Sequence, residues 1–256
     1  MKYAIIISEK DSASMNIKES LEAYNFPKEV KIYLVKEESI YQENIDEKIN
    51  ADYFIFATRH QSAAGKKSLT CHIPGNFSKS EVGGKEKELC IAPASLLKTM
   101  FLNLKKNAKD FESEITLEVT HHGPLLRKKP CMFIEIGSTE KDWSDKRAGG
   151  IIAKTIFETL SNDIKEYPCI IGFGGNHYCV SFNKIELESN YAFSHICPSY
   201  MLDALNEDTF KQMIKRSKEK VILAVIDWKG CNSEQRIKVL EFLEKYKIEW
   251  KKSKDL

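Results

Sequence analysis

Residues 3–8 have the sequence YAIIIS, residues 12–24 the sequence SASMNIKESLEAY, and residues 30–35 the sequence VKIYLV. Three consecutive isoleucines predict a buried strand, and the spacing of apolar residues in the second stretch predicts a helix that begins near Asp11 or Ser12. The third stretch predicts another strand. A strand, a helix and a strand in this order are typical of an α/β fold.

The same alternation continues along the chain. We expect further strands at residues 52–57, 114–119, 131–136, 169–173 and 221–226, and helices at residues 93–104, 143–160 and 233–246. We therefore predict an α/β fold in which one layered domain, residues 1–256, has a mixed, largely parallel sheet flanked by helices. Residues 58–87 are polar, contain several glycines and show little periodicity, which predicts a long functional loop.

Composition narrows the class of protein. Of the 256 residues, 42% are hydrophobic and 30% are charged, which is typical of a globular protein with a sizeable core. The longest apolar runs are too short to cross a bilayer and no secretory signal is visible, so we expect a cytoplasmic protein without a membrane partner. Seven cysteines without a Cys-x-x-Cys pair argue against a disulfide framework, and a net charge of +2 argues against a highly basic nucleic-acid coat protein.

The histidines are the most informative residues. His60, the pair His121-His122 and His177 each follow a predicted strand, whereas His72 lies within the predicted loop. Ligands of open α/β sheets bind beyond the carboxyl ends of strands, so we expect these side chains to share one pocket. A histidine there can transfer protons or bind a metal ion.

Polar residues beside the histidines predict the rest of this pocket. Glu135 lies inside an apolar strand and Glu118 in the strand before His121, where a carboxylate must find a partner or shift its pKa. Glycines before His177 would let backbone N–H groups approach an oxyanion. The candidates for substrate binding share polar or small side chains close to a histidine motif: Arg59, Gln61, Ser62, Lys66, Lys67, Arg127, Gly174, Gly175 and Asn176. The histidines could also bind zinc, although no His-Glu-x-x-His motif is present.

Five ordered motifs resemble the archaeal and plant D-aminoacyl-tRNA deacylases, over nearly the whole chain. They are Ala57-Thr58-Arg59-His60-Gln61-Ser62, Leu69-Thr70-Cys71-His72-Ile73-Pro74-Gly75-Asn76-Phe77, Glu118-Val119-Thr120-His121-His122-Gly123-Pro124, Glu135-Ile136-Gly137-Ser138 and Gly172-Phe173-Gly174-Gly175-Asn176-His177-Tyr178. The resemblance implies hydrolysis of the ester between a D-amino acid and the 3′ end of tRNA. It also implies a fold similar to peptidyl-tRNA hydrolases and nucleoside phosphorylases, tRNA as the partner, and zinc as the cofactor.

The resemblance suggests roles for these residues. We expect His121, His122, or a zinc ion that they help to bind, to activate water, and His177 or the Gly174 and Gly175 amides to stabilise the oxyanion. Glu135 completes the catalytic candidates. The zinc-ligand candidates are His60, His72, His121 and His122. The cationic side chains expected to contact tRNA phosphates are Arg59, Lys66, Lys67 and Arg127.

Two other functions remain open at this stage. A metal-dependent hydrolase or phosphorylase of a small nucleoside-like substrate would use the same pocket without contacting a tRNA body. A non-catalytic RNA-binding module would bind tRNA without cleaving it, but leaves the clustered histidines unexplained, because phosphates are normally bound by Lys and Arg. No obligate protein partner is evident.

Overall fold

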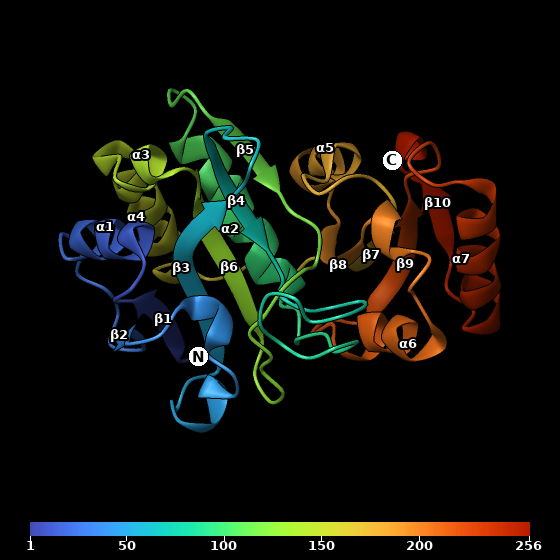
Figure 1. The fold of residues 1–256 in the computed structure, drawn as a ribbon, viewed down its shortest axis with the longest axis horizontal. Helices are drawn as coiled ribbons and strands as arrows, with labels where there is room; N and C mark the ends of the chain where they lie inside the picture. The colour runs from blue at the N-terminus through green and yellow to red at the C-terminus, as the bar shows by residue number, and fades with distance from the viewer.

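The strands divide into two sheets. In the computed structural model, which describes residues 1–256, the larger sheet has the order β2-β1-β3-β6-β4-β5 and the smaller has the order β10-β9-β7-β8 (Figure 1). The strands are β1 (Tyr3–Ser8), β2 (Val30–Val35), β3 (Tyr53–Gln61), β4 (Ser68–His72), β5 (Glu114–Leu117), β6 (Cys131–Ser138), β7 (Cys169–Phe173), β8 (Ala192–Cys197), β9 (Val221–Ile226) and β10 (Trp250–Lys252). The α-helices are α1 (Ser12–Leu21), α2 (Ala94–Asn107), α3 (Glu140–Trp143), α4 (Lys146–Leu160), α5 (Val180–Glu188), α6 (Glu207–Lys215) and α7 (Ser233–Lys245).

The predicted fold class is confirmed. Neighbouring strands are parallel except for β4, which runs antiparallel to β6. The expected single sheet is instead two sheets, a difference that local periodicity does not reveal because it reports burial and not which strands pair. No helix has the length and apolar character needed to cross a membrane.

Part of the predicted loop at residues 58–87 is sheet. Residues 58–61 extend β3, and β4 lies between β6 and β5. All five residues of β4 are buried, but only Leu69 and Cys71 are apolar, and they join the main core. The alternate residues Ser68, Thr70 and His72 face a buried polar site, so the strand lacks the contrast between apolar and exposed polar residues that marks a strand in a sequence.

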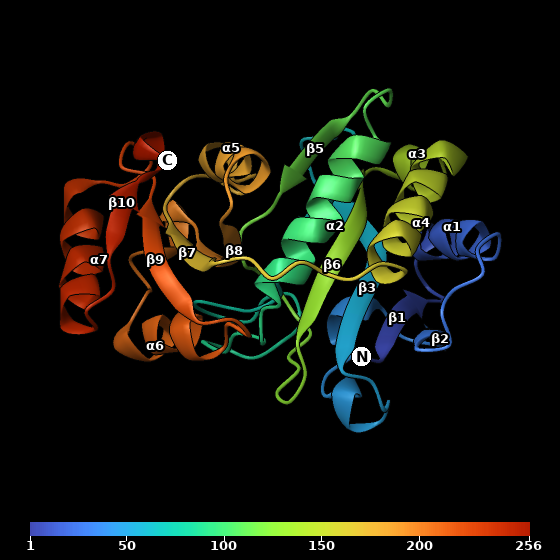
Figure 2. The same cartoon turned by 180° about the vertical axis from the view of Figure 1, so that it is seen from behind.

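Helices cover only one face of the larger sheet. Figure 2 shows α2 and α4 lying across it from behind, whereas the opposite face, with Phe54, Phe56 and Phe133, is covered by loops and short 3-10 turns. The main core of 41 buried residues continues from this sheet into the smaller one through Ile170, Phe193 and other residues. The two sheets therefore share one apolar core.

Candidate active site

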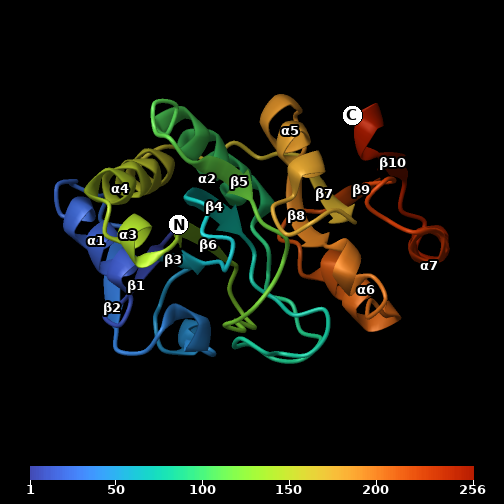
Figure 3. The same ribbon diagram turned by 45° about the horizontal axis from the view of Figure 1, so that its top comes forward.

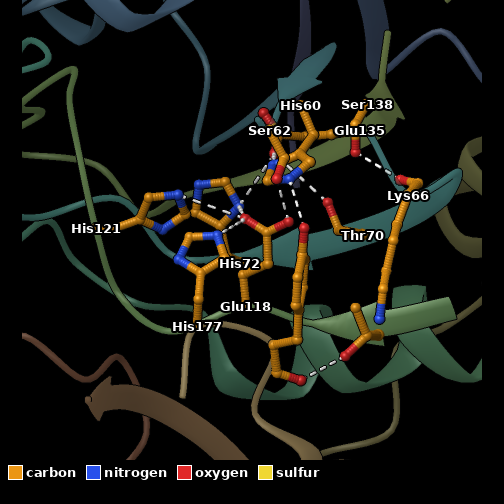
Figure 4. Close-up of polar contacts among 12 residues, drawn as sticks. His60, Ser62, Lys66, Thr70, His72, Glu118, His121, Glu135, Ser138 and His177 are labelled. Atoms are coloured by element: carbon orange, nitrogen blue, oxygen red, sulfur yellow. Dashed lines mark hydrogen bonds and ion pairs between the residues drawn. The ribbon is translucent and has the colours of Figure 1, made fainter. Parts of the chain in front are cut away.

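Glu118 lies at the centre of the histidine cluster. Its side chain is fully buried, directly after β5. His60 Nδ1 lies 3.0 Å from Oε1, whereas His177 Nε2 lies 3.3 Å and His121 Nε2 3.4 Å from Oε2. His72 Nδ1 is 3.7 Å from Oε2. Figure 4 shows these four rings turned toward the carboxylate from different segments of the chain.

Backbone pairing holds Glu118 at the junction of the two sheets. The Glu118 N–H donates to the Cys71 carbonyl at 3.0 Å, which ties it to β4 of the larger sheet. The next two residues, Val119 and Thr120, donate to the carbonyls of His177 and Ile196, both at 3.0 Å, on the side of the smaller sheet. The cluster is therefore built by both sheets (Figure 3).

Two buried carboxylates in this cluster have opposite protonation tendencies. Burial opposes ionisation of Glu118, but His177 and His60 hold its pKa well below the usual range. Burial, and then repulsion from Glu118, raise the pKa of Glu135 well above the usual range. Glu135 lies 3.6 Å from His72 Nδ1 and 3.8 Å from His60 Nδ1. The site thus pairs two carboxylates whose pKa values are shifted in opposite directions, the arrangement that separates acid and base roles.

The backbone orients His121 and His122. His121 Nδ1 donates to the Val119 carbonyl at 2.8 Å, and His122 Nδ1 donates to the Gly123 carbonyl at 2.6 Å. Since a carbonyl only accepts, the hydrogen of each neutral ring lies on Nδ1 and Nε2 keeps a lone pair. Burial is the main cause that lowers the pKa of His122 to about 4 and the pKa of His121 well below its usual range. Both rings are therefore neutral at pH 7.

These residues fit a metal ion. Neither ring nitrogen of His72 has a hydrogen-bond partner, although the side chain is fully buried. One ligand atom from each of His72, His121 and His122 lies within 4.8 Å of the others, and the same holds for His60, Glu118 and His177. A metal-binding histidine usually donates its second N–H to a carbonyl, as His121 and His122 do. The group can therefore hold a divalent cation, and its donor atoms are of the kind zinc prefers.

A cleft of about 550 Å³ opens above this cluster, and we name it the histidine cleft. Its lining includes His60, His121, His122, His177 and Glu135. Arg59, Gln61 and Ser62 lie along its wall, and Ile40 and Val82 form an apolar part of the lining. The volume is within the range of small-molecule sites.

The structure brings most predicted site residues together. The catalytic and zinc-ligand candidates all lie in the cluster, and three polar candidates lie in the cleft wall: Arg59, Gln61 and Ser62. Arg59 is held by Glu38 at 3.0 Å and by the Trp143 ring, 5.2 Å from its centroid. His195, the remaining histidine, lies in β8 apart from the cluster, with Nδ1 3.4 Å from the Thr120 hydroxyl.

Other candidates lie outside the cleft. Lys67 binds Asp145 at 2.7 Å, Arg127 binds Glu88 at 3.3 Å, and the exposed Lys66 is not in the cleft lining. The expectation that the Gly174 amide binds an oxyanion is wrong, because this N–H donates to the Cys197 carbonyl at 2.9 Å. Gly175 and Asn176 lie in the same turn, also outside the cleft lining.

Sequence reasoning missed three contributors to the site. Tyr178 places its hydroxyl 3.2 Å from His60 Nε2, and Tyr200 places its hydroxyl 3.4 Å from His177 Nδ1. Asp11 caps α1 through the Ser14 N–H at 3.0 Å and also accepts the Arg59 N–H at 2.9 Å. Asp11 was recognised only as a helix cap, and no local pattern signals that a cap also reaches a distant strand.

Comparisons with known proteins show which family this chain resembles along most of its length. The sequence model of the D-aminoacyl-tRNA deacylase family matches residues 47–251. The D-aminoacyl-tRNA deacylase of Methanocaldococcus jannaschii is 39% identical over 268 residues, which cover 98% of this chain and 100% of that protein. The D-aminoacyl-tRNA deacylase of Pyrococcus furiosus is 36% identical, with coverages of 91% and 93%. The crystal structure of AF0625, a conserved protein of unknown function, is similar with a TM-score of 0.92 and 31% identity, covering 99% of this chain and 96% of that one.

Proposed function

This chain belongs to the D-aminoacyl-tRNA deacylase family, and on that premise we propose that it hydrolyses the ester between a D-amino acid and the 3′ end of tRNA in the histidine cleft. One observation carries the proposal: the buried, ionised Glu118 lies within 3.7 Å of four histidines beneath a cleft of about 550 Å³. Because tRNA is its substrate, we place its activity in the cytoplasm.

The protein's own side chains divide the work of ester hydrolysis. Glu118 orients the His60 and His177 rings through contacts of 3.0 and 3.3 Å, as a buried carboxylate does beside a catalytic histidine. His177 is the more exposed of the two rings, so it can reach the substrate and donate to the oxyanion. Glu135 lines the cleft, and because burial raises its pKa well above the usual range, it is suited to give a proton to the departing ribose oxygen.

We propose zinc as the cation that this cluster holds. His72, His121 and His122 would bind it, with His60, Glu118 and His177 forming an adjacent set of ligand atoms. A bound zinc ion lowers the pKa of coordinated water to about 7 and so supplies a hydroxide at neutral pH. The carbonyls of Val119 and Gly123 keep the Nε2 atoms of His121 and His122 unprotonated and available.

The remaining cleft residues position the substrate. Arg59 is fixed by Glu38 and Trp143, and with Gln61 and Ser62 it presents polar groups to the terminal nucleotide and its phosphate. Ile40 and Val82 offer the apolar surface that an amino-acid side chain would contact. The ester with its nucleotide and the amino-acid side chain would thus fix two substituents of the α-carbon, and chiral discrimination needs one further contact, to the α-amino group or the α-hydrogen.

A deacylation assay on matched D- and L-tyrosyl-tRNA, with and without a chelator, tests the proposal. We expect the D-ester to be hydrolysed and the L-ester to be spared. Removing metal should lower the rate at least about a hundredfold, and added zinc should restore it. Turnover of neither ester would contradict the proposed function, and full activity after verified metal removal would contradict the zinc proposal.

A further inference from the structure

Two tryptophans and two cations form a surface group on the smaller sheet, and we name Trp228, Trp250, Arg236 and Lys252 the indole patch. The indole rings are stacked, with centroids 5.8 Å apart and planes at 9°. Arg236 Cζ lies 4.8 Å and Lys252 Nζ 4.5 Å from the centroid of the Trp228 ring. Trp250 is 38% exposed.

The cations of the indole patch have no acidic partner. Lys211 and Lys245 of the same half of the molecule both bind Glu207, at 3.0 and 2.9 Å. In contrast, Arg236 and Lys252 form no ion pair and lie over the face of the Trp228 indole, and Arg236 Nε is buried without a hydrogen-bond partner. Their positive charge is therefore available to an anion.

The patch lies near the carboxyl ends of β9 and β10, where Trp228 follows β9 and Lys252 pairs with Ile226. Ile170 of β7 belongs to the same core cluster as Phe182 of α5, whereas its neighbour Ile171 belongs to the cluster that contains Val239 of α7. Successive strand residues face opposite sides of a sheet, so α5 and α7 cover opposite faces. The chain leaves β7 and β9 in opposite directions, and such divergent carboxyl ends form the usual binding crevice of an α/β sheet.

A continuous series of contacts joins the patch to the histidine cleft. Trp228 follows Asp227, which accepts the Ser181 hydroxyl at 2.8 Å at the start of α5. Arg236 follows Gln235, which donates to the Ser199 carbonyl at 3.0 Å. The Ser199 N–H in turn donates to the Gly175 carbonyl at 3.0 Å.

The residue after Ser199 reaches the site. Tyr200, 52% exposed, places its hydroxyl 3.4 Å from His177 Nδ1. Figures 1 and 3 show α5, β9 and β10 side by side at this end of the molecule. The indole patch is therefore linked to the cleft through Ser199 and Tyr200.

We propose that the indole patch binds the single-stranded 3′ end of tRNA, at the nucleotides that precede the terminal adenosine. This inference rests on the proposed function, because it names where the same substrate continues outside the cleft. Unpaired bases stack on indole faces, and unpaired Arg and Lys beside them neutralise the phosphates, which is the chemistry of single-strand recognition. Tyr200 supplies a further exposed ring between the patch and His177.

Two substrates separate this surface from the reaction centre. D-tyrosyl-tRNA carries the whole 3′ strand, whereas the D-tyrosyl ester of adenosine carries only the terminal nucleoside. For Lys252→Glu and Trp250→Ala we expect KM for D-tyrosyl-tRNA to rise about tenfold or more, since one stacked base contributes about 1–3 kcal/mol. We expect kcat to stay near wild type and hydrolysis of the adenosine ester to be unchanged. The affinity of Lys252→Glu for uncharged tRNA should also depend less steeply on salt.

Lys251→Glu is the matched control, because Lys251 is adjacent in β10 but points to the opposite face of the strand. Near-normal KM in this control, with intact thermal unfolding in all variants, supports the proposal. An equal rise in KM for D-tyrosyl-tRNA in Lys251→Glu and Lys252→Glu would overturn the proposal, because it would show that tRNA is attracted by the general positive charge of this surface. Unchanged KM in both patch variants, or an equal loss on the adenosine ester, would also overturn it. Failure of the proposed function is distinct, since the wild-type protein would then hydrolyse neither substrate.

Discussion

Glu118 is the residue on which the reaction depends most. We expect Glu118→Gln to lower kcat/KM for D-tyrosyl-tRNA at least about a hundredfold, because glutamine keeps the shape but loses the charge that four histidines face. Glu112→Gln, an exposed change in the same segment, is the control and should behave as wild type. Retention of normal kcat/KM by a folded Glu118→Gln variant would contradict the role assigned to the carboxylate.

His195 shows the structural use of a histidine in the same protein. Burial lowers its pKa to about 4 from the usual 6.5, so between these values the unfolded chain binds a proton that the folded chain does not. The stability from keeping His195 neutral is thus complete above pH 6.5 and is lost as the pH falls toward 4. The loss amounts to at most about 3 kcal/mol, at 1.36 kcal/mol per pKa unit.

The variant His195→Gln tests this contribution. Its free energy of unfolding should fall less than that of the wild-type protein between pH 7 and pH 4, because glutamine takes up no proton. Other buried histidines titrate in both proteins, so the difference between the two profiles isolates His195. Parallel profiles would show that His195 does not contribute.

The turn between β7 and α5 depends on a glycine at its first position. Gly174 has φ +96°, and a Cβ there would lie 2.5 Å from Cys231 Sγ. We expect Gly174→Ala to destabilise the protein by about 2 kcal/mol or more, since both the backbone conformation and the packing oppose it. Chemical denaturation would measure the change in the free energy of unfolding.

Gly150 in α4 is a glycine whose position, unlike that of Gly174, leaves room for a side chain. Nothing lies within 4 Å of a Cβ at this position, which is in the helix interior. Gly150→Ala should therefore stabilise by about 0.5–1 kcal/mol. A destabilisation of equal size in both variants would show that the glycine content, and not the geometry of the β7–α5 turn, controls stability.

Local sequence patterns predict that a strand or helix is present better than they predict where it ends or which strands it pairs with. Four strands have the predicted bounds: residues 3–8, 30–35, 169–173 and 221–226. Three of them, β1, β7 and β9, are nearly continuous apolar and buried runs, whereas β2 is partly exposed and is identified by its β-branched and aromatic residues. β4 was missed because its polar face is buried in the active site, where the usual contrast between faces is absent.

At the scale of the whole molecule, we propose that the two sheets form one folding unit. The main core includes residues of both sheets, and Glu118 is held by backbone bonds that reach both. Trp143 reports on the larger sheet, whereas Trp228 and Trp250 report on the smaller. One variant would keep only Trp143, and the other would keep only Trp228 and Trp250. The two variants should unfold at the same urea concentration, measured as the midpoint of the change in tryptophan fluorescence. Two separate midpoints would instead show two independent domains.

The sequence by itself determined the α/β class, the positions of the strongest strands, and the expectation that histidines meet at strand ends. It also carried the five motifs that resemble the family. These properties are encoded locally, in periodicity and in residues close along the chain. Only the tertiary structure decided that Glu118 is the centre of the site, that His195 lies outside it, and that the Gly174 amide is already bonded. Such outcomes depend on which strands pair across two sheets, and that is a non-local choice.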